Sequence, residues 1–188
     1  MDKTEENYYQ SLYEIAAALN STSTPEVIRQ SIVESLAKAV GAKGCSLMLL
    51  TPDKKTLIHN VAYGLSDWYV RKGPISVDKS ISESLAGKPV AVLDATKDER
   101  IQYQEQAKKE GIASILSVPM MLRDEIIGVI RVYTAEQRHF NMGDMYFVGA
   151  VANLGAIALE NAKLYETLKK DYETFRREML ENQPDRDW

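Results

Sequence analysis

A single cysteine stands in the 188 residues of this sequence, which also contains only two histidines. Cys45 has no second cysteine to pair with, so an internal disulfide and any zinc site with more than one thiolate ligand are excluded. The sequence also lacks a glycine-rich phosphate loop, a Ser-His-Asp set and a group of His and Cys at metal-ligand spacing. These absences argue against an enzyme and against a metal site, and they leave any cofactor unidentified.

Long hydrophobic runs and an excess of basic residues are missing as well. The most apolar run, residues 148–159, includes Asn153 and is about a dozen residues long, whereas a membrane-spanning helix needs about 20. The N-terminus is acidic and polar and shows no apolar signal-peptide region. Because the net charge is −4, binding to a nucleic acid backbone is not expected as the main activity. We therefore expect a cytoplasmic protein without membrane insertion and without a nucleic acid partner.

What the sequence does contain is a regular succession of helix and strand patterns, in a length that suits one domain and an extra element. Two N-terminal helices are predicted, and the second has Thr24 as its cap, Pro25 at its first position and Gly41 as its stop. The further predicted elements are strands 45–50 and 56–63, a short helix 78–87, a strand 89–94, a polar helix 99–110, strands 112–121 and 125–134, and a last helix from Asn141 to about Leu180. This order predicts an α+β fold built on one antiparallel sheet.

Four stretches of the sequence, in this order, carry a resemblance to a known family. They are CSLMLLTPD, HNVAYGL, LAGKPVAVLDA and the long run from SILSVPMMLRDEIIGVIRVYT through HFNMGDMYFVGAVANLGAIALENAKLY. The long run is the most specific, with Val118-Pro119, Gly128-Val129, Phe140 followed by Asp144, and Asn161-Ala162. From about Thr24 to Tyr165 the chain resembles the GAF domain family, a small-molecule sensing and regulatory module of bacterial signalling proteins.

The resemblance implies a GAF-like fold, with a central antiparallel sheet of five or six strands. The N- and C-terminal helices would pack on one face of this sheet. Short helices and loops would lie over the other face, where family members hold ligands. We expect an N-terminal dimerisation helix over residues 1–20, a GAF domain over residues 21–165, and a C-terminal coiled-coil extension and tail over residues 166–188.

Candidate ligand-binding residues follow from the alternation of side chains along the predicted strands. Arg131 and Tyr133 are expected to face the loops rather than the helices, where a charged and a phenolic group suit a polar ligand. The full set of candidates is Ser46, Met48, Asp94, Tyr103, Arg131 and Tyr133. The alternative is that Arg131 pairs with a carboxylate such as Asp94 and closes this face without a ligand.

Other activities known in the family find little support in the residues. Relatives that reduce free methionine sulfoxide use several cysteines, and relatives that bind bilins usually carry a reactive cysteine, often followed by histidine. Cys45 is alone, is followed by Ser46 and lies on a strand that should be buried. A haem ligand would have to be His59 or His139, each of which is expected to be a structural or surface histidine. The Asn-Lys-x-Phe-Asp-Glu set of the nucleotide-binding relatives is absent.

The last predicted helix carries an apolar seam that continues past the end of the domain. Its members recur in alternating steps of three and four: Val151, Leu154, Ala158, Asn161, Tyr165, Leu168, Tyr172, Phe175 and Met179. Beyond Tyr165 no domain remains for the seam to cover, so a second copy of the chain is expected to cover it. The predicted homodimer interface comprises Leu12, Leu19, Leu154, Tyr165, Leu168, Tyr172 and Phe175.

The sequence therefore favours a dimeric sensing domain that reports a small molecule through its terminal helices. The rival hypothesis is a structural dimerisation or protein-interaction module with no bound ligand. Because no output domain is recognisable in the sequence, the chain is expected to be part of a larger sensor or to act on a kinase or another output-domain partner.

Overall fold

The computed structural model of the protein describes residues 3–20, 24–77 and 86–181. Its elements, in chain order, are α1 (Lys3–Leu19), α2 (Pro25–Val40), β1 (Gly44–Leu50), β2 (Thr56–Tyr63), α3 (Asp67–Val70), β3 (Ile75–Ser76), β4 (Val90–Val92), α6 (Gln104–Glu110), β5 (Ser114–Leu122), β6 (Glu125–Thr134) and α7 (Met142–Glu181). The short helix predicted over residues 78–87 lies mostly outside the described residues.

The ends of α2 are set by the residues that the sequence singles out. The Thr24 side chain accepts a hydrogen bond from the backbone N–H of Val27, and Pro25 follows as the first helical residue. Gly41 ends the helix with a φ of 64°, a left-handed conformation that glycine adopts without steric cost. The predicted cap and stop of this helix are confirmed.

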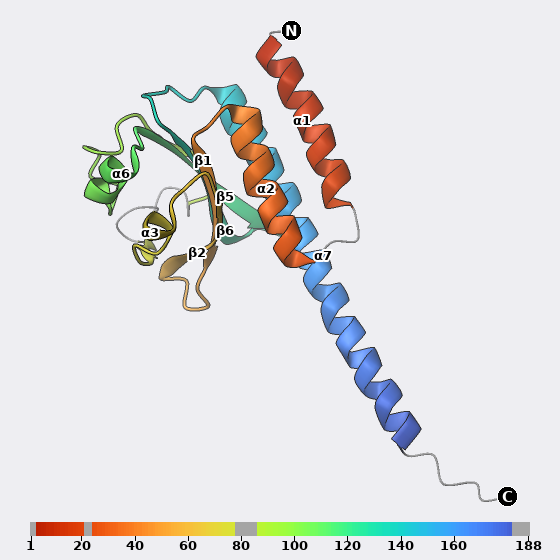
Figure 1. Ribbon diagram of the computed structural model, residues 1–188. Helices are drawn as coiled ribbons and strands as arrows, with labels where there is room; N and C mark the ends of the chain where they lie inside the picture. Colours follow the sequence, from red (N-terminus) through yellow and green to blue (C-terminus); the bar gives the residue numbers. More distant parts are fainter. Residues whose placement is uncertain (1–2, 21–23, 78–85, 182–188) are drawn as a thin grey trace, which may run out of the picture.

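The strands form one antiparallel sheet, in which six strands are described in the order β3-β2-β1-β6-β5-β4 (Figure 1). β1 and β6 lie at its centre, so the first and last hairpins of the chain pair with each other. Gly128 permits this close approach, because a Cβ there would lie 2.3 Å from the carbonyl oxygen of Met48. The predicted α+β fold with a central antiparallel sheet is confirmed.

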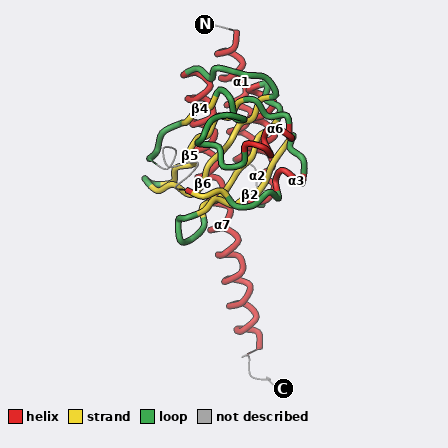
Figure 2. The backbone as a smooth tube through the Cα atoms, turned by 90° about the vertical axis from the view of Figure 1, so that its left-hand side faces the viewer, coloured by secondary structure: helices red, strands yellow, loops and turns green. Residues whose placement is uncertain are grey.

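Helices α2 and α7 cover one face of the sheet, which we call the helix face, and α1 packs against these two helices. The opposite face, which we call the loop face, lies beneath α3, α6 and the connecting loops (Figures 1 and 2). The centre of the helix face is apolar, since Leu47, Leu116 and Ile130 of the strands pack with Leu36 of α2 and Val151 of α7, all fully buried. Burying an apolar side chain of this kind stabilises a fold by about 1.5–3 kcal/mol.

A β-bulge in β2 decides which residues reach the loop face. Leu47 of β1 lies opposite Val61, whereas the next residue, Met48, lies opposite His59, so Asn60 is an extra residue in β2. Residues directly opposite each other in an antiparallel pair share a face. His59 therefore lies on the loop face with Met48, although an unbroken alternation would place it on the same face as Val61.

α7 is a continuous helix of 40 residues, about 60 Å long at 1.5 Å per residue. Asn141 and Asp144 cap its start reciprocally, because each side chain accepts a hydrogen bond of 2.9 Å from the backbone N–H of the other. From Lys163 to Met179 every side chain is exposed, and this part projects beyond the sheet (Figure 1). By length and composition alone α7 could also cross a membrane, a test that the core helix of a globular domain passes as well.

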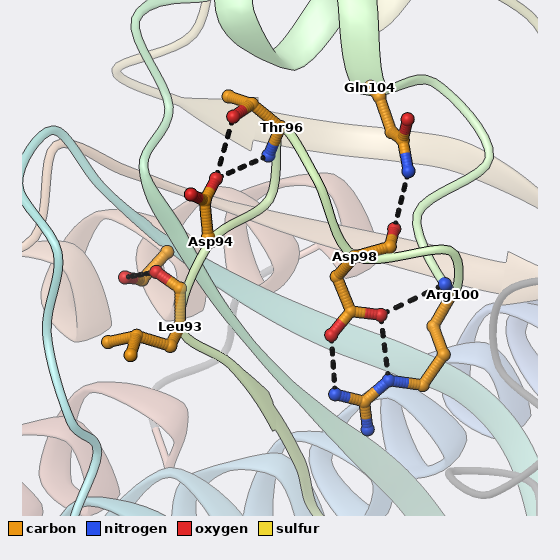
Figure 3. A network of polar contacts seen from close by, with 7 residues as sticks. Leu93, Asp94, Thr96, Asp98, Arg100 and Gln104 are labelled. Carbon is orange, nitrogen blue, oxygen red and sulfur yellow. Dashed lines mark hydrogen bonds and ion pairs between the residues drawn. The ribbon is translucent and has the colours of Figure 1, made fainter.

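The connection into α6 differs from the prediction of a helix over residues 99–110, since the helix begins only at Gln104. Figure 3 shows why. The Asp98 carboxylate accepts hydrogen bonds of 2.9 Å from the backbone N–H and from the guanidinium of Arg100, and the Asp98 carbonyl accepts one from the Gln104 side chain. These local bonds hold a turn where the first helical turns were expected.

Two further elements, α3 and β3, were not predicted. They have four and two residues, which is too short for a periodic pattern to indicate them.

Candidate functional site

A buried polar cluster lies on the loop face, across the three central strands β1, β6 and β5. Ser46, Arg131 and Ser117 occupy neighbouring positions in the two ladders, with Arg131 opposite both serines. The Arg131 Nε donates a hydrogen bond of 2.9 Å to the Ser117 hydroxyl, and the Ser46 and Tyr133 hydroxyls lie 2.9 Å apart. Arg131 is only 3% exposed. A buried guanidinium is costly to desolvate and needs polar partners, and the Ser117 hydroxyl is one of them.

A second basic group reaches the loop face from the turn after α3. The Lys72 ammonium donates hydrogen bonds to the Tyr69 carbonyl at 3.0 Å and to His59 Nε2, which lies 2.9 Å away. It also lies 3.6 Å from the centroid of the Tyr69 ring, a cation–π contact. In the described part of the chain Lys72 has no carboxylate within ion-pair distance. Its charge is therefore held by neutral groups alone.

The protonation of the Lys72–His59 pair follows from burial and from neighbouring charge. Burial, together with the positive charges of Lys72 and Arg131, lowers the pKa of His59 to about 3. Burial also lowers the pKa of Lys72 to about 7; Arg131 acts in the same direction, and Glu110 opposes it. Near neutral pH His59 is therefore neutral and accepts from Lys72 through Nε2, which assigns the ring proton to Nδ1. This buried Nδ1 has no hydrogen-bond partner among the described residues.

Aromatic side chains enclose these basic groups. The Tyr69 ring packs edge-on against the Tyr133 ring, with centroids 6.0 Å apart. The Tyr103 hydroxyl donates to the Pro74 carbonyl at 3.0 Å, and Lys72 lies 5.8 Å from the Tyr103 ring centroid. Burial raises the pKa of both Tyr69 and Tyr133, so both phenols are neutral donors at physiological pH.

The carboxylate of Glu110, at the end of α6, is engaged elsewhere. It accepts hydrogen bonds from the backbone N–H and from the hydroxyl of Ser66, the residue that caps α3. Because this contact joins α6 to the start of α3, the two short helices are fixed relative to each other. Glu110 thereby positions the turn that carries Lys72 without forming an ion pair with it.

The structure brings together some of the residues that the sequence proposes and separates others. Ser46, Arg131 and Tyr133 belong to the buried polar cluster, and Tyr103 lies beside Lys72. Met48 is also on the loop face, but it is fully buried in an apolar group with its neighbours Leu57, Ile75 and Val129. Met48 therefore fills the space toward β2 and β3.

Asp94 lies apart from this cluster, in the turn that follows β4. Its carboxylate accepts hydrogen bonds from the backbone N–H of Thr96 at 3.0 Å and from the Thr96 hydroxyl at 2.6 Å (Figure 3). Its second oxygen lies 3.4 Å from the Lys97 ammonium and 3.3 Å from the Gln137 amide. The pairing of Arg131 with Asp94 that the sequence left open is not formed.

Four residues at the loop face are not among the candidates taken from the sequence: His59, Tyr69, Lys72 and Ser117. His59 depends on the bulge at Asn60, and Lys72 follows a helix of four residues. Of these four residues, Ser117 could have been found from the pairing of the predicted strands. It stands two positions before Pro119 on a predicted strand, and it lies opposite Arg131.

Cys45 lies on the helix face, in the apolar core with α2 and α7. It is fully buried, and burial raises its pKa well above the usual range of a thiol. The thiol is therefore protonated and lies on the opposite side of the sheet from the polar cluster.

The residues proposed for a dimer interface fall into two groups. Leu12, Leu19 and Leu154 are half-buried, the first two against the helix-face core. Tyr165, Leu168, Tyr172 and Phe175 are between 60% and 69% exposed, all on the projecting part of α7. No contact within the described chain covers this second group.

The fold and the loop face together define a class: a single-sheet α+β domain with helices on one face and short elements enclosing buried polar groups on the other. Comparison with known protein families identifies this class. The sequence model of the GAF domain matches residues 24–159, and the chain belongs to the GAF domain family. No curated protein sequence matches the chain.

Solved structures of GAF domains share the fold. The GAF domain of a phosphoenolpyruvate-protein phosphotransferase (ptsP) from Coxiella burnetii superposes with a TM-score of 0.76 at 19% identity, covering 87% of this chain and 98% of that one. Free methionine-R-sulfoxide reductase from Neisseria meningitidis, in complex with its substrate, gives 0.72 at 16%, covering 88% and 95%. The blue-light absorbing PixJ GAF domain from Thermosynechococcus elongatus gives 0.62 at 16%, covering 80% and 93%. The similar folds thus include domains of signalling proteins.

Proposed function

We propose that this chain is a ligand-sensing or regulatory GAF domain of a cytoplasmic signalling protein. In this proposal it acts as a homodimer, and it transmits a small-molecule-induced change through its terminal helices to a kinase or another output-domain partner. It carries out no reaction of its own. The family and the signalling proteins among its structural neighbours support this role.

The observation that carries the proposal is that β6 contacts both sides of the domain. Arg131 and Tyr133 lie on the loop face, while Ile130 and Val132, which alternate with them, are buried in the helix-face core with α7. A ligand that favours one arrangement of the loop-face groups shifts the population of strand positions. Helices packed on that strand respond by small changes of angle or register.

The exposed stripe on α7 supports the homodimer. Tyr165, Leu168, Tyr172 and Phe175 follow one another at spacings of three and four residues, as in the seam of a two-stranded coiled coil. A continuous stripe of large exposed apolar side chains is unfavourable in water. A second copy of α7 would cover this stripe with an identical stripe, which is the symmetry of most homodimers.

The dimer is tested by placing charge in the seam. We expect the double variant Leu168→Glu and Phe175→Glu to sediment as a monomer, because two carboxylates would face their counterparts across the interface. The matched control is Thr167→Glu with Thr174→Glu, which adds the same charge one position away from the seam and should leave the dimer intact. An unchanged dimer mass for the seam variant would overturn this assignment, and so would dissociation of the control.

The proposed transmission of a ligand-induced change through α7 is tested by the distance between two spin labels, one on each copy of the chain in the dimer. A label on Thr174→Cys lies on the exposed part of α7, and the buried thiol of Cys45 should not react. We expect the distribution of label distances to change when a ligand occupies the loop face. A distribution identical with and without bound ligand would contradict the signalling role.

The alternative is a structural dimerisation module with no ligand, and one observation favours it. Met48 and Tyr133, two of the candidate ligand-binding residues, are fully buried and fill part of the loop face. Native mass spectrometry of the purified chain separates the two hypotheses. A co-purifying small molecule supports sensing, whereas a ligand-free dimer that binds nothing from a metabolite panel supports the structural role.

The absence of a reaction is also part of the proposal. The structural neighbour from Neisseria meningitidis is a methionine sulfoxide reductase, but here the thiol of Cys45 is buried and protonated on the other face of the sheet. A substrate on the loop face would therefore meet no thiolate. We expect no reduction of free methionine sulfoxide by the purified chain, and turnover that is lost in Cys45→Ser would contradict this.

A further inference from the structure

The projecting part of α7 contains two consecutive segments of seven residues with nearly the same sequence. Residues 165–171 read YETLKKD, and residues 172–178 read YETFRRE. The two segments differ only by exchanges within a type of side chain, and every one of these side chains is exposed. A helix alone has 3.6 residues per turn and does not need a repeat of seven, whereas a helix that winds around another does.

The apolar seam assigns the positions of this repeat, written a to g. Position a holds Tyr165 and Tyr172, and position d holds Leu168 and Phe175. The positions that flank the seam, and therefore border a partner helix, are e and g. They carry opposite charges, with Lys169 and Arg176 at e and Asp171 and Glu178 at g.

This distribution of charge favours one orientation of a second copy. In a parallel pair of helices in register, position g lies beside position e of the following heptad on the other helix, so Asp171 meets Arg176 of the partner subunit. Because of the two-fold symmetry this ion pair forms twice. In an antiparallel pair, g faces g and e faces e, so that carboxylates meet carboxylates and cations meet cations. The flanking charges therefore favour the parallel pair.

Asp171 has no suitable cation on its own helix. Glu166 and Glu173 are each followed four residues later by a basic residue, Lys170 and Arg177, which is the spacing of ion pairs within one helix. The residues three and four positions from Asp171 on either side are two threonines, a leucine and a phenylalanine. In the described part of the chain Asp171 forms no ion pair. Its charge is thus available to a partner.

The same arrangement extends along α7 toward the domain. Ile157 and Leu164, which are 51% and 54% exposed, occupy position g of the two preceding heptads. In a parallel pair they would lie beside Ala162 and the aliphatic stem of Lys169 of the partner subunit. Apolar side chains therefore flank the seam near the domain, and the ion pairs flank it farther along the helix.

We propose that two copies of the chain associate through α7 in parallel and in register, and that Asp171 with Arg176 of the partner subunit sets this orientation. The proposal rests on the homodimer given above and adds its orientation and the residues that select it. Both domains then lie at the same end of the paired helices. A change of angle or register in one copy of α7 acts directly on the other copy along its whole exposed length.

Charge reversal in the whole chain tests the ion pair at low ionic strength. Asp171→Lys and Arg176→Glu each replace two symmetry-related attractions by repulsions, so we expect each variant to dimerise about tenfold more weakly in analytical ultracentrifugation. The double variant restores the pair in reverse and should return to within about twofold of the parent. The matched control is Arg177→Glu, which makes the same substitution at the next position, away from the partner helix, and should also stay within about twofold.

Disulfide formation at position d measures the orientation independently. Leu168→Cys and Phe175→Cys, each made alone, should both cross-link to the same residue of the partner subunit under oxidation, because a disulfide requires Cα atoms within about 7 Å of each other. In an antiparallel pair, residues face their own counterparts only at the midpoint, so at most one of the two variants could cross-link. The buried thiol of Cys45 should not react in either variant.

The outcomes separate the orientation from the homodimer itself. Weaker single variants, a restored double variant and cross-links at both positions support the parallel pair. Single variants that dimerise as tightly as the parent, a double variant no tighter than the single ones, or cross-linking at fewer than both positions would overturn the orientation and leave the homodimer intact. A parent chain that sediments as a monomer would overturn the homodimer and, with it, this proposal.

Discussion

The two faces of the sheet bury different kinds of side chain. On the helix face, Leu47, Leu116 and Ile130 of the strands meet an equally apolar surface on the helices. On the loop face, the same strands bury Ser46 and Arg131, and Lys72 joins them from the turn after α3. One sheet therefore stabilises the domain from one side and holds costly polar groups on the other.

The difference indicates a division of roles between the faces. Apolar burial on the helix face provides the free energy that a small domain needs. A buried charge lowers stability unless it is compensated, so it persists in a marginally stable protein when it is used for something else. If this division is correct, substitutions on the two faces should differ in sign as well as in size.

The largest effect is expected from truncating the centre of the helix face. Leu36→Ala removes three carbons from a fully buried position on α2 and should lower the free energy of unfolding by about 2–5 kcal/mol, because a cavity remains. Chemical denaturation measures it. The control is Val27→Ala on the exposed side of the same helix, which should change stability by less than about 0.5 kcal/mol. Equal losses at the two positions would mean that the helix face is not the main source of stability.

A smaller loss is expected at the polar contact that joins α1 to α7. The Tyr8 hydroxyl donates a hydrogen bond of 2.6 Å to the Asp144 carboxylate, which also binds the Arg138 guanidinium at 2.8 Å. Burial and the hydrogen bond to Asp144 raise the pKa of Tyr8 to about 12. Tyr8→Phe keeps the ring stacked on Phe147 but loses the bond to a charged group, a cost of about 1.5–3 kcal/mol.

Tyr9→Phe is the matched control for this prediction, because Tyr9 is 65% exposed on the same helix. Thermal unfolding should show a lower midpoint for Tyr8→Phe and little change for the control. A Tyr8→Phe variant as stable as the parent would show that α1 is held by apolar packing alone.

Much of the helix face could be predicted from the sequence, because its signals are local. Thr24 marks the start of α2 by its side-chain cap, and Gly41 marks its end by its left-handed backbone. The alternation along β6 places Arg131 and Tyr133 correctly on the loop face. Each of these signals depends on residues only a few positions away in the sequence, so it can be recognised without knowledge of the tertiary structure.

The loop face was less predictable because its residues depend on irregularities. The extra residue Asn60 places His59 on the same face of the sheet as Met48. Such an insertion cannot be recognised from the alternation of side chains along a strand. Lys72 is positioned by a four-residue helix that depends on Glu110, 44 positions beyond its cap Ser66. Asp94 is a predicted ligand residue because it follows a strand, and in the structure its bonds to Thr96 hold it in a turn apart from the polar cluster.

The smallest change, and one of opposite sign, is expected at the loop face. Lys72→Met retains an unbranched side chain beside the Tyr69 ring and removes a half-buried charge. Replacing buried ionic groups by apolar ones is often neutral or stabilising, so we expect a gain of about 1 kcal/mol in the free energy of unfolding at pH 7.

The pH dependence of this difference provides a stricter check. In the folded parent the pKa of Lys72 is about 7, below its ordinary value of 10.5, so between these values the unfolded chain binds a proton that the folded chain lacks. The stability of the parent therefore rises with pH over this window because of Lys72, and Lys72→Met lacks that rise. The advantage of the variant should be largest at pH 6 and shrink between pH 7 and pH 9. Taking the difference between the two proteins at each pH removes the titration of Cys45 and the buried tyrosines, which both proteins share. A difference that stays constant from pH 6 to pH 9 would show that Lys72 is not held as a destabilised cation, and the contrast between the two faces would then rest on Arg131 alone.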